Sequence, residues 1–197
     1  LTTCAVCAVP LPDEASATCA KCDTRYCSAA CRHSHWRGGH RGLCPEIRRA
    51  GGAEQYNADK RYAEAVEAAV EECAEDTEGQ TCYICLEGDS EEGLVRMCAC
   101  RGGAGFAHVS CLARQAKILV AEAEERHLDD DQWVRWWTCS LCGQDYHGVV
   151  ACALGWACWK TYLGRAETDW LRMSAMRMLG LGLTDAKHYE DALSVQE

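Results

Sequence analysis

Apolar residues recur with helical spacing in two parts of this chain. Tyr62, Val66 and Val70 stand four residues apart among alanines and glutamates, which predicts a helix that Gly79 ends. We expect this helix to be an exposed linker. After Gly148 the chain is rich in Ala, Leu and Met, and its apolar residues recur every three to four positions. This second pattern predicts helices that must pack against something.

A third helical pattern, LARQAKILVAEAEERHLDDD, lies between Cys111 and Cys139. It predicts a solvated helix that ends in an acidic run, and a dedicated docking arm is the alternative. The segments on either side have few apolar residues, so something other than a hydrocarbon core must fold them.

Cysteine is several times more frequent than usual, with 17 in 197 residues. That content is typical of disulfide-rich secreted chains or of metal sites. No signal-peptide pattern opens the sequence, and its longest weakly polar run, residues 148–159, is far shorter than the roughly 20 residues of a membrane span. We therefore expect a soluble, cytoplasmic or nuclear chain in a reducing compartment, where paired cysteines bind metal more often than each other.

The negative charge is unevenly distributed. The net charge is −10, but residues 1–50 have seven Lys/Arg and four Asp/Glu, whereas residues 51–81 have two and nine. Nucleic-acid binding needs a basic surface, so this composition disfavours nucleic acid as a partner. No membrane partner is expected for this sequence. The sequence stops inside what looks like a repeat, so we expect it to belong to a longer chain.

Eight candidate zinc ligands lie in the first 44 residues. Cysteines separated by two residues can reach one tetrahedral zinc from a tight turn, and ligands separated by three residues lie one helical turn apart on the same face. Because this segment has few apolar residues, metal must supply its folding energy, on the order of 10 kcal/mol per zinc. The ligands are Cys4, Cys7, Cys19, Cys22, Cys27, Cys31, His40 and Cys44.

This order of ligands, with the text RYCSAAC and a tryptophan before the closing H-x3-C, resembles the MYND zinc finger over residues 4–44. The resemblance implies binding of short proline-containing peptides near Arg32 and Trp36. Arg32 stands where the family usually has Gln. Trp36 is one residue further from His40 than is usual in the family. Trp36 can instead be a packing lid over the zinc, and we expect His33 and His35 to face solvent. The resemblance also implies interleaved ligation, with Cys4, Cys7, Cys27 and Cys31 on one zinc and Cys19, Cys22, His40 and Cys44 on the other.

A second set of eight ligands lies in residues 82–142. Glycines in the segment RGGAGFA let the backbone turn tightly between sites, where zinc replaces a core. The order of four cysteines, one histidine and three cysteines is shared by the PHD finger and the RING-CH, or variant RING, domain. The ligands are Cys82, Cys85, Cys98, Cys100, His108, Cys111, Cys139 and Cys142.

Ligand spacing favours the RING-CH domain. One residue separates the third and fourth ligands, and seven separate Cys100 from His108, whereas PHD fingers usually differ at both places. The texts CYICLEG, CRGGAGFAHVSCL and TCSLCGQDY also resemble RING-CH domains over residues 81–146. The resemblance implies a cross-brace, with Cys82, Cys85, His108 and Cys111 on one zinc and Cys98, Cys100, Cys139 and Cys142 on the other.

The RING-CH resemblance implies an adaptor that docks a ubiquitin-charged E2 enzyme and orients its thioester toward a substrate lysine, so no residue of this chain is catalytic. The family's E2 surface corresponds to Ile84 and to Trp136 and Trp137, the nearest apolar residues before the last ligand pair. At least one of these tryptophans or Trp133 is expected in the core. Gly143 stands where many active RING domains have a basic residue, which leaves a non-catalytic scaffold as an alternative.

The tail, TDWLRMSAMRMLGLGLTDAKHYEDALSVQE, resembles the front half of a tetratricopeptide or kinesin-light-chain repeat. The resemblance rests on Leu179 and Gly180, followed by Tyr189, Ala192 and Leu193 at positions where two antiparallel helices would touch. A plain helical hairpin packed on the zinc domain is the alternative.

Taken together, the patterns predict small zinc-stabilised α+β modules, a MYND finger and a cross-brace RING-CH domain, joined by a helix and followed by an α-helical segment. The expected boundaries are 1–46, 47–80, 81–147 and 148–197. We expect a zinc-binding E3 ubiquitin ligase or ligase-like adaptor with four Zn²⁺ per chain, which docks an E2 and recruits protein substrates or peptides through the MYND finger and the tail. A non-catalytic interaction scaffold and a PHD-type peptide reader are the alternatives. The remaining cysteines, expected to be inert buried thiols, are Cys73, Cys152 and Cys158.

Overall fold

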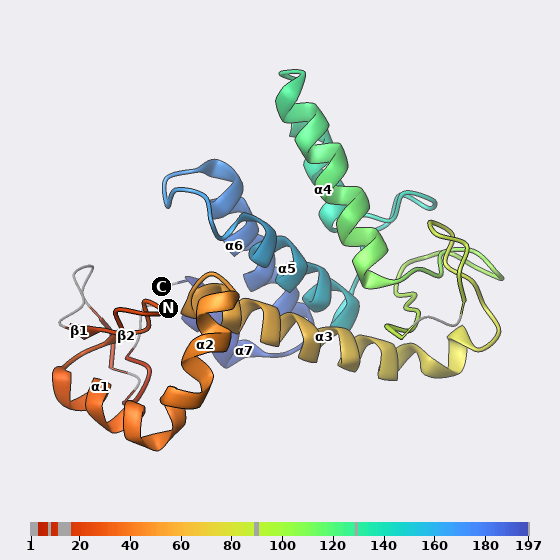
Figure 1. The fold of residues 1–197 in the computed structure, drawn as a ribbon. Helices are drawn as coiled ribbons and strands as arrows, with labels where there is room; N and C mark the ends of the chain where they lie inside the picture. The colour runs from red at the N-terminus through yellow and green to blue at the C-terminus, as the bar shows by residue number, and fades with distance from the viewer. Residues whose placement is uncertain (1–3, 8, 12–16, 89–90, 129, 197) are drawn as a thin grey trace. The chain divides into compact units, whose positions relative to one another are not determined.

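The structure, a computed structural model, describes residues 4–7, 9–11, 17–88, 91–128 and 130–196. The chain divides into two compact units, residues 1–60 and 61–197, and Figure 1 labels the helices and strands of both. Each unit has its own buried side chains. None of the described helices is long and apolar enough to cross a membrane.

The first unit contains a small hairpin that follows the loop of Cys4 and Cys7. Strand β1 (Ala17–Thr18) pairs antiparallel with β2 (Arg25–Tyr26). Helix α1 (Ala29–His35) follows, and its N-cap residue Ser28 accepts a hydrogen bond from the N–H of Cys31 at 3.2 Å. A serine in this position satisfies a backbone donor that the first turn leaves unpaired, so the sequence starts the helix here.

A wide π-type turn, η1 (Trp36–His40), joins α1 to α2 (Arg41–Arg49). The backbone is kinked at Gly39, whose φ is 126°. A π-type turn contains more residues than an α-helical turn. The π-type turn spans the residues from Trp36 to His40, and His40 lies in the interior of the unit.

Helix α3 (Ala53–Thr77) is the helix predicted between the two zinc-binding segments. It ends two residues before Gly79, whose φ of 70° is incompatible with a continuing helix. The prediction of an exposed linker is wrong for the second half of α3, because Val66, Ala69 and Cys73 are buried in the core of the second unit. Their spacing of three and four residues places them on one face of the helix.

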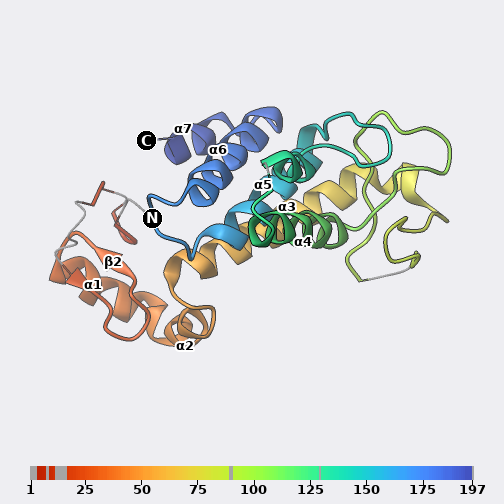
Figure 2. The same cartoon turned by 90° about the horizontal axis from the view of Figure 1, so that it is seen from above.

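The second unit combines zinc-binding loops with helices that pack on one another. Helix α4 (Val109–Glu125) is followed by a short 3-10 helix, η2 (Asp130–Trp136). After the last ligand pair come α5 (Gly148–Tyr162), α6 (Trp170–Asp185) and α7 (Tyr189–Gln196). Helix α5 packs against both α4 and α6, and α7 packs against α6 (Figure 2). The sequence therefore forms the packed helices that its apolar spacing predicted after Gly148.

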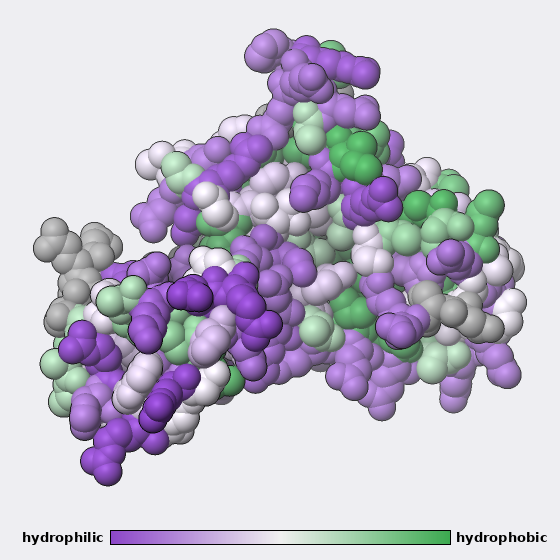
Figure 3. Space-filling model, in the orientation of Figure 1, coloured by the Kyte–Doolittle hydropathy of each residue, from purple (hydrophilic) through white to green (hydrophobic). Residues whose placement is uncertain are grey.

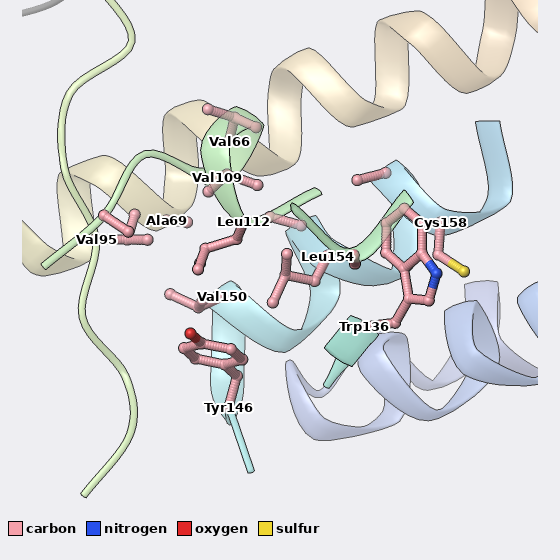
Figure 4. Close-up of a cluster of buried hydrophobic side chains, with 14 of the residues drawn as sticks. Val66, Ala69, Val95, Val109, Leu112, Trp136, Tyr146, Val150, Leu154 and Cys158 are labelled. Atoms are coloured by element: carbon pink, nitrogen blue, oxygen red, sulfur yellow. The ribbon is translucent and has the colours of Figure 1, made fainter. Parts of the chain in front are cut away.

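Helix α4 has a buried face, which corrects the prediction of a solvated helix between Cys111 and Cys139. Leu112, Ala116 and Val120 are at most 4% exposed. They pack with side chains of α3 and α5 in one cluster (Figure 4). The apolar residues of α4 recur every four positions, so they form a stripe that the many charged residues of the other faces obscure in the sequence.

Helices α5 and α6 approach each other very closely at Gly182. A β-carbon at this position would lie 2.6 Å from the carbonyl oxygen of Ala151, which is shorter than a carbon–oxygen contact allows. The Asp185 carboxylate at the end of α6 also accepts a hydrogen bond from the N–H of Gly148 at the start of α5. Glycine is thus required at position 182 for the backbones to meet.

The tail forms two adjoining helices, but only part of the predicted contact between them is present. Leu179, Gly180 and Ala192 are buried, as predicted. Tyr189 and Leu193 are 58% and 65% exposed, so the helix contacts predicted for these two residues are wrong. The reason is the orientation of α7, which turns Ala192 toward α6 and its neighbour Leu193 away.

Candidate metal centres

Four groups of four ligand side chains form in the structure, two in each unit. Within each group the ligand atoms lie within 4.8 Å of one another. These groups are the interleaved sets that the two family resemblances implied, and they are positioned as zinc sites. They are Cys4, Cys7, Cys27 and Cys31; Cys19, Cys22, His40 and Cys44; Cys82, Cys85, His108 and Cys111; and Cys98, Cys100, Cys139 and Cys142.

The sulfur separations in the first group fit tetrahedral zinc. Cys7 Sγ lies 3.5 Å from Cys27 Sγ and 3.9 Å from Cys31 Sγ, and the last two sulfurs are 3.5 Å apart. Four Zn–S bonds of about 2.3 Å in a tetrahedron place sulfurs about 3.8 Å from each other. The ligands therefore need no large rearrangement to bind the ion.

The second group of the first unit uses His40 through its Nε2 atom, which lies 3.4 Å from Cys22 Sγ. Cys19 Sγ and Cys44 Sγ are 3.8 Å apart. The other ring nitrogen of His40, Nδ1, is buried and has no hydrogen-bond partner among the described residues. Its neighbours are aromatic rings, including Trp36 at 6.0 Å between ring centroids.

His35 lies beside this site, which corrects the prediction that it faces solvent. Its ring lies 4.7 Å from the ring of His40, and its Nδ1 is 3.0 Å from the hydroxyl of Tyr26. The reason is helical spacing: His35 stands four residues after the ligand Cys31, and so shares its face of α1. His33 is exposed, as predicted.

The two groups in the second unit have the same dimensions. His108 lies with Nδ1 at 3.4 Å from Cys85 Sγ and 3.7 Å from Cys111 Sγ. In the other group, Cys100 Sγ and Cys139 Sγ are 3.8 Å apart. Sulfur and nitrogen at these separations suit tetrahedral coordination by structural zinc.

Three of the Cys-x2-Cys pairs form the same backbone turn, which we call a zinc knuckle. In the knuckle at Cys82, its N–H donates to the carbonyl of Glu87 and its carbonyl accepts from the N–H of Leu86, both at 2.8 Å. The knuckles at Cys19 and Cys139 contain the equivalent pair of hydrogen bonds. In each one, the residue after the second cysteine has a left-handed backbone, with φ of 55° at Asp23, 66° at Leu86 and 67° at Gly143.

Thiol acidity within one group shows why a cation is needed. Hydrogen bonding by the backbone N–H of Gln144 is the main reason that the pKa of Cys142 is lowered to about 7. In the same group, burial is the main reason that the pKa of Cys100 is raised to about 11. Adjacent thiols cannot all ionise next to one another without a balancing positive charge. A divalent cation would let all four bind as thiolates.

Gly105 explains one of the glycines in RGGAGFA. Its φ is 87°, and a β-carbon there would lie 2.6 Å from Cys100 Cβ and 2.9 Å from Cys100 Sγ. No larger residue fits without displacing a ligand. The prediction that glycine lets the chain turn tightly between the sites is confirmed at this position.

Arg96 attaches the zinc-binding loops to α3. Its guanidinium donates to the carbonyl of Gly102 at 2.7 Å and lies 4.2 Å from the ring centroid of Phe106. It also lies 3.6 Å from the Asp76 carboxylate on α3. These contacts hold the backbone between the two ligand groups against the helix.

The three remaining cysteines lie outside the four groups. Cys73, Cys152 and Cys158 are all buried, and burial raises the pKa of each thiol, to about 11 for Cys152. Neutral, inaccessible thiols are poor nucleophiles. This burial agrees with the prediction of inert structural cysteines.

Comparison with known families assigns both halves of this metal-binding framework. The model of the MYND finger matches residues 4–44, and that of the RING-variant domain matches residues 82–142. The chain contains a MYND finger and a RING-variant domain. No curated protein and no solved structure has a significant match to the chain, and nothing in the comparisons supports a tetratricopeptide repeat in the tail.

The tryptophans before the last ligand pair of the RING-variant domain divide between core and surface. Trp136 is 0% exposed and packs among Trp133 and Tyr162. A partner cannot reach Trp136, so the prediction that it contacts an E2 is wrong. Trp136 is instead the tryptophan that the sequence led us to expect in the core. Trp137 and Ile84 are half-buried at the edge of the core, and their partner contacts remain predictions.

The predicted peptide-binding residues of the MYND finger lie at its surface. Arg32 donates from Nη1 to the carbonyl of Thr18 on β1 at 3.3 Å. Trp36 is 37% exposed, so it covers His40 on one side while remaining accessible on the other. An open hollow of about 580 Å³ lies next to it, lined by Trp36, Arg37, Gly39, Arg41 and Gly42.

Sequence reasoning missed two arginines and two leucines at these sites. Arg37 and Arg41 line the hollow beside Trp36, and the turn at Gly39 lies between them in the sequence. The sequence carried no regular helical pattern that would have paired them. Leu86 and Leu141 are 77% and 53% exposed in the zinc knuckles of the RING-variant domain. Their position next to metal ligands was the available signal, because a short metal-bound turn has no interior in which to bury them.

Proposed function

We propose that the chain acts as an E3 ubiquitin ligase or ligase-like adaptor, in which the RING-variant domain docks a ubiquitin-charged E2 and the MYND finger recruits a protein partner. The observation that carries this proposal is the RING-variant match over residues 82–142, together with two interleaved ligand groups that lie at zinc-binding distances. Zinc supplies structural cross-links here, because each group already has four protein ligands and leaves no open coordination position.

The reaction that such a domain promotes needs no catalytic side chain from it. The amine of a substrate lysine attacks the ubiquitin thioester carbonyl, an isopeptide bond forms, the carbon–sulfur bond breaks, and the E2 cysteine leaves as a thiolate while the amine loses its proton. The domain contributes by holding the charged E2 in an orientation that favours attack. Ile84 and Trp137 are the proposed docking residues.

Recruitment by the MYND finger is supported by the hollow beside Trp36. Arg37 and Arg41 are exposed there, and no described residue forms an ion pair or hydrogen bond with either guanidinium. The aromatic surface suits a proline or another apolar residue, and the two arginines favour a peptide that also carries carboxylates. Arg32 is proposed to contact the same peptide outside the hollow.

The helical tail is proposed as an additional recruiting surface, whether or not it begins a repeat. Leu181 on α6 and Leu193 on α7 are 58% and 65% exposed, and Met173 is 49% exposed. Exposed apolar residues on neighbouring helices are a common basis for protein contacts.

A non-catalytic scaffold is the second candidate function, and Gly143 favours it. This residue follows the last zinc ligand, lies at an exposed position and offers no positive charge to a bound ubiquitin. A β-carbon at this position would meet no atom within 4 Å, although the φ of 67° is unfavourable for a side chain. Gly143→Arg is therefore expected to fold and to raise transfer if the chain is a ligase.

The deciding experiment measures discharge of ubiquitin from a panel of charged E2 enzymes, together with autoubiquitination, by the zinc-loaded chain. Wild-type protein should accelerate discharge by at least one E2, Ile84→Ala should reduce it by about tenfold at unchanged zinc content, and Cys98→Ser should abolish it. Failure of the wild-type protein with every E2 would favour the scaffold.

A further inference from the structure

A second hollow lies in the helical part of the second unit. Its volume is about 230 Å³, and it is lined by residues from the end of α4, from η2 and from the start of α6. None of the described residues that line it is a zinc ligand. Sites for drug-sized ligands usually measure about 300–1,000 Å³, so this hollow suits a single side chain of a partner.

Two tryptophans form a corner of the hollow. The ring centroids of Trp133 and Trp170 are 5.6 Å apart, and the ring planes meet at 62°. Trp133 also packs against the buried rings of Tyr162 and Trp136, at 5.3 Å and 6.3 Å between centroids. Trp170 follows Asp169, whose side chain caps the start of α6. The corner is therefore held in place without a ligand.

This group of aromatic rings already binds one cation. The guanidinium carbon of Arg165 lies 5.5 Å from the ring centroid of Tyr162, within the range of a cation–π contact. The same guanidinium donates to both carboxylate oxygens of Glu124, at 2.9 Å and 2.8 Å. Trp170 is 40% exposed and belongs to none of the buried clusters. Its ring thus remains accessible to a second cation.

The end of α4 makes this region negative. The C-terminus of a helix carries partial negative charge, which basic residues in the last turn usually balance, but α4 has none there. Its last turn contains Glu122, Glu124 and Glu125 instead. The sequence of residues 122–131 has six Asp/Glu and one Arg. Hydrophilic side chains cover the end of α4, at the top of the space-filling view (Figure 3). A cationic ligand complements this charge.

The geometry favours an ammonium group over a guanidinium group. A planar guanidinium binds best when it stacks parallel to a ring or donates two hydrogen bonds to one carboxylate. Here the two rings form a corner, and both oxygens of Glu124 already accept from Arg165. A rounded ammonium group can approach two ring faces at once, and a methylated one needs no hydrogen-bond acceptor.

We propose that the hollow between Trp133 and Trp170 binds a lysine side chain, unmodified or methylated, from a partner protein. The two rings hold the ammonium group, and the acidic end of α4 attracts it. The inference does not depend on ligase activity, because a ligase substrate and a partner of a scaffold can both present a lysine. The site also differs in charge preference from the hollow beside Trp36, where two arginines favour carboxylates.

The experiment uses the zinc-loaded chain and a synthetic peptide with blocked ends and one central lysine in a neutral sequence. Binding is followed through the indole N–H signals of Trp133 and Trp170 by NMR, which detects weak affinities. Trimethyl-lysine at the central position should bind at least as tightly as lysine, because the cation–π attraction survives methylation. Norleucine, an uncharged side chain of similar length, should bind about tenfold more weakly, and arginine should also bind more weakly than lysine. The affinity for lysine should fall as salt rises.

Trp170→Leu tests the aromatic corner. It should weaken the lysine peptide by about tenfold, followed through the Trp133 signal, and should leave zinc content and melting temperature unchanged because Trp170 is partly exposed. Tyr189→Leu is the matched control, since Tyr189 is an exposed aromatic residue on α7 that does not line the hollow. It should leave the affinity unchanged.

Several outcomes would overturn the inference. Equal affinity for norleucine and lysine would show an apolar docking site, and tighter binding of arginine would contradict the preference for ammonium. A lower melting temperature in Trp170→Leu would show that this ring has a structural role. Binding of phosphatidylcholine vesicles that depends on Trp170, without binding of the lysine peptide, would show that the occupant is a lipid headgroup. The absence of any shift in either indole signal would exclude the site.

Discussion

The two units of the fold differ in what fills their interiors. We call residues 1–60 the MYND unit and residues 61–197 the RING-variant unit, after the domain that each contains. Most of the buried cluster in the MYND unit consists of zinc ligands, whereas most of the large cluster in the second unit consists of hydrocarbon side chains from α3, α4, α5 and α6. The first unit therefore depends on metal for its folding free energy, and the second has a helical core that supports itself in part. The MYND cluster is Cys4, Cys19, Cys22, Tyr26, Cys44 and Ile47.

Removing zinc should produce the largest difference between the units. Metal analysis should first find four zinc ions per chain, one for each group of ligands. A strong chelator should then unfold residues 4–44 completely, because each site contributes on the order of 10 kcal/mol. Amides of α5 and α6 should retain measurable hydrogen-exchange protection, since their buried contacts involve no ligand. Equal loss of protection in both units would contradict the comparison.

Replacing one ligand should confine the effect to one unit. Cys98→Ser should reduce the zinc content from four to three and expose amides of the loops at residues 91–107 to exchange. Protection in α5 and in the MYND finger should persist. Cys7→Ser is the reciprocal variant, and it should unfold the MYND finger while E2 discharge is unchanged. Loss of MYND protection in Cys98→Ser would show that the units do not fold independently.

Overpacking between helices should destabilise the second unit only. Gly182→Ala places a methyl group against the Ala151 carbonyl and should lower the free energy of unfolding by about 2 kcal/mol. Gly164→Ala is the control, because a β-carbon there meets no atom within 4 Å. The measurement is thermal unfolding, monitored by the loss of helical signal in circular dichroism. Equal melting temperatures for the two variants would contradict the close approach of α5 and α6.

The smallest expected effect lies at the surface of the MYND finger. Changing Arg37 and Arg41 together to Gln should lower the affinity of the MYND finger for a synthetic acidic, proline-containing peptide by about tenfold, because two charged contacts are lost. Fluorescence polarisation measures this affinity. Arg48→Gln should change affinity little, since Arg48 does not line the hollow. Zinc content should be the same in all variants. Preferential binding of a single-stranded oligonucleotide would contradict the assignment to an acidic peptide.

Ligand spacing predicted the metal centres because zinc geometry is local. Two or three intervening residues fix whether side chains such as Cys27 and Cys31 can meet one ion. The grouping of the pairs came from family resemblance, and the structure assembles the same groups. The helices after Gly148 were predictable for a similar reason, since apolar spacing reports a face that must be covered.

Tertiary packing decided what spacing alone could not. Neither Trp136 nor Trp137 carries a local signal that identifies which one is buried, and only the position of Tyr162 and Trp133 explains why Trp136 is enclosed. The burial of Ala69 within α3 has the same origin, because alanines recur along that whole helix and only some meet the second unit. The exposed Leu86 was missed because the knuckle conformation at its position was not inferred from the ligand pattern.

Interleaved ligation also determines the order in which the zinc sites can be completed during translation. The MYND ligands are complete when residue 44 has been made, so that finger can close early around its metal. In the RING-variant domain, Cys98 and Cys100 must wait for Cys139 and Cys142, which emerge after the whole of α4. At about 5 to 20 residues per second, this leaves half a site open for a few seconds on the ribosome. During that interval two unligated thiols are exposed to oxidation and to mispairing with the neighbouring site, and a prompt supply of zinc shortens their exposure.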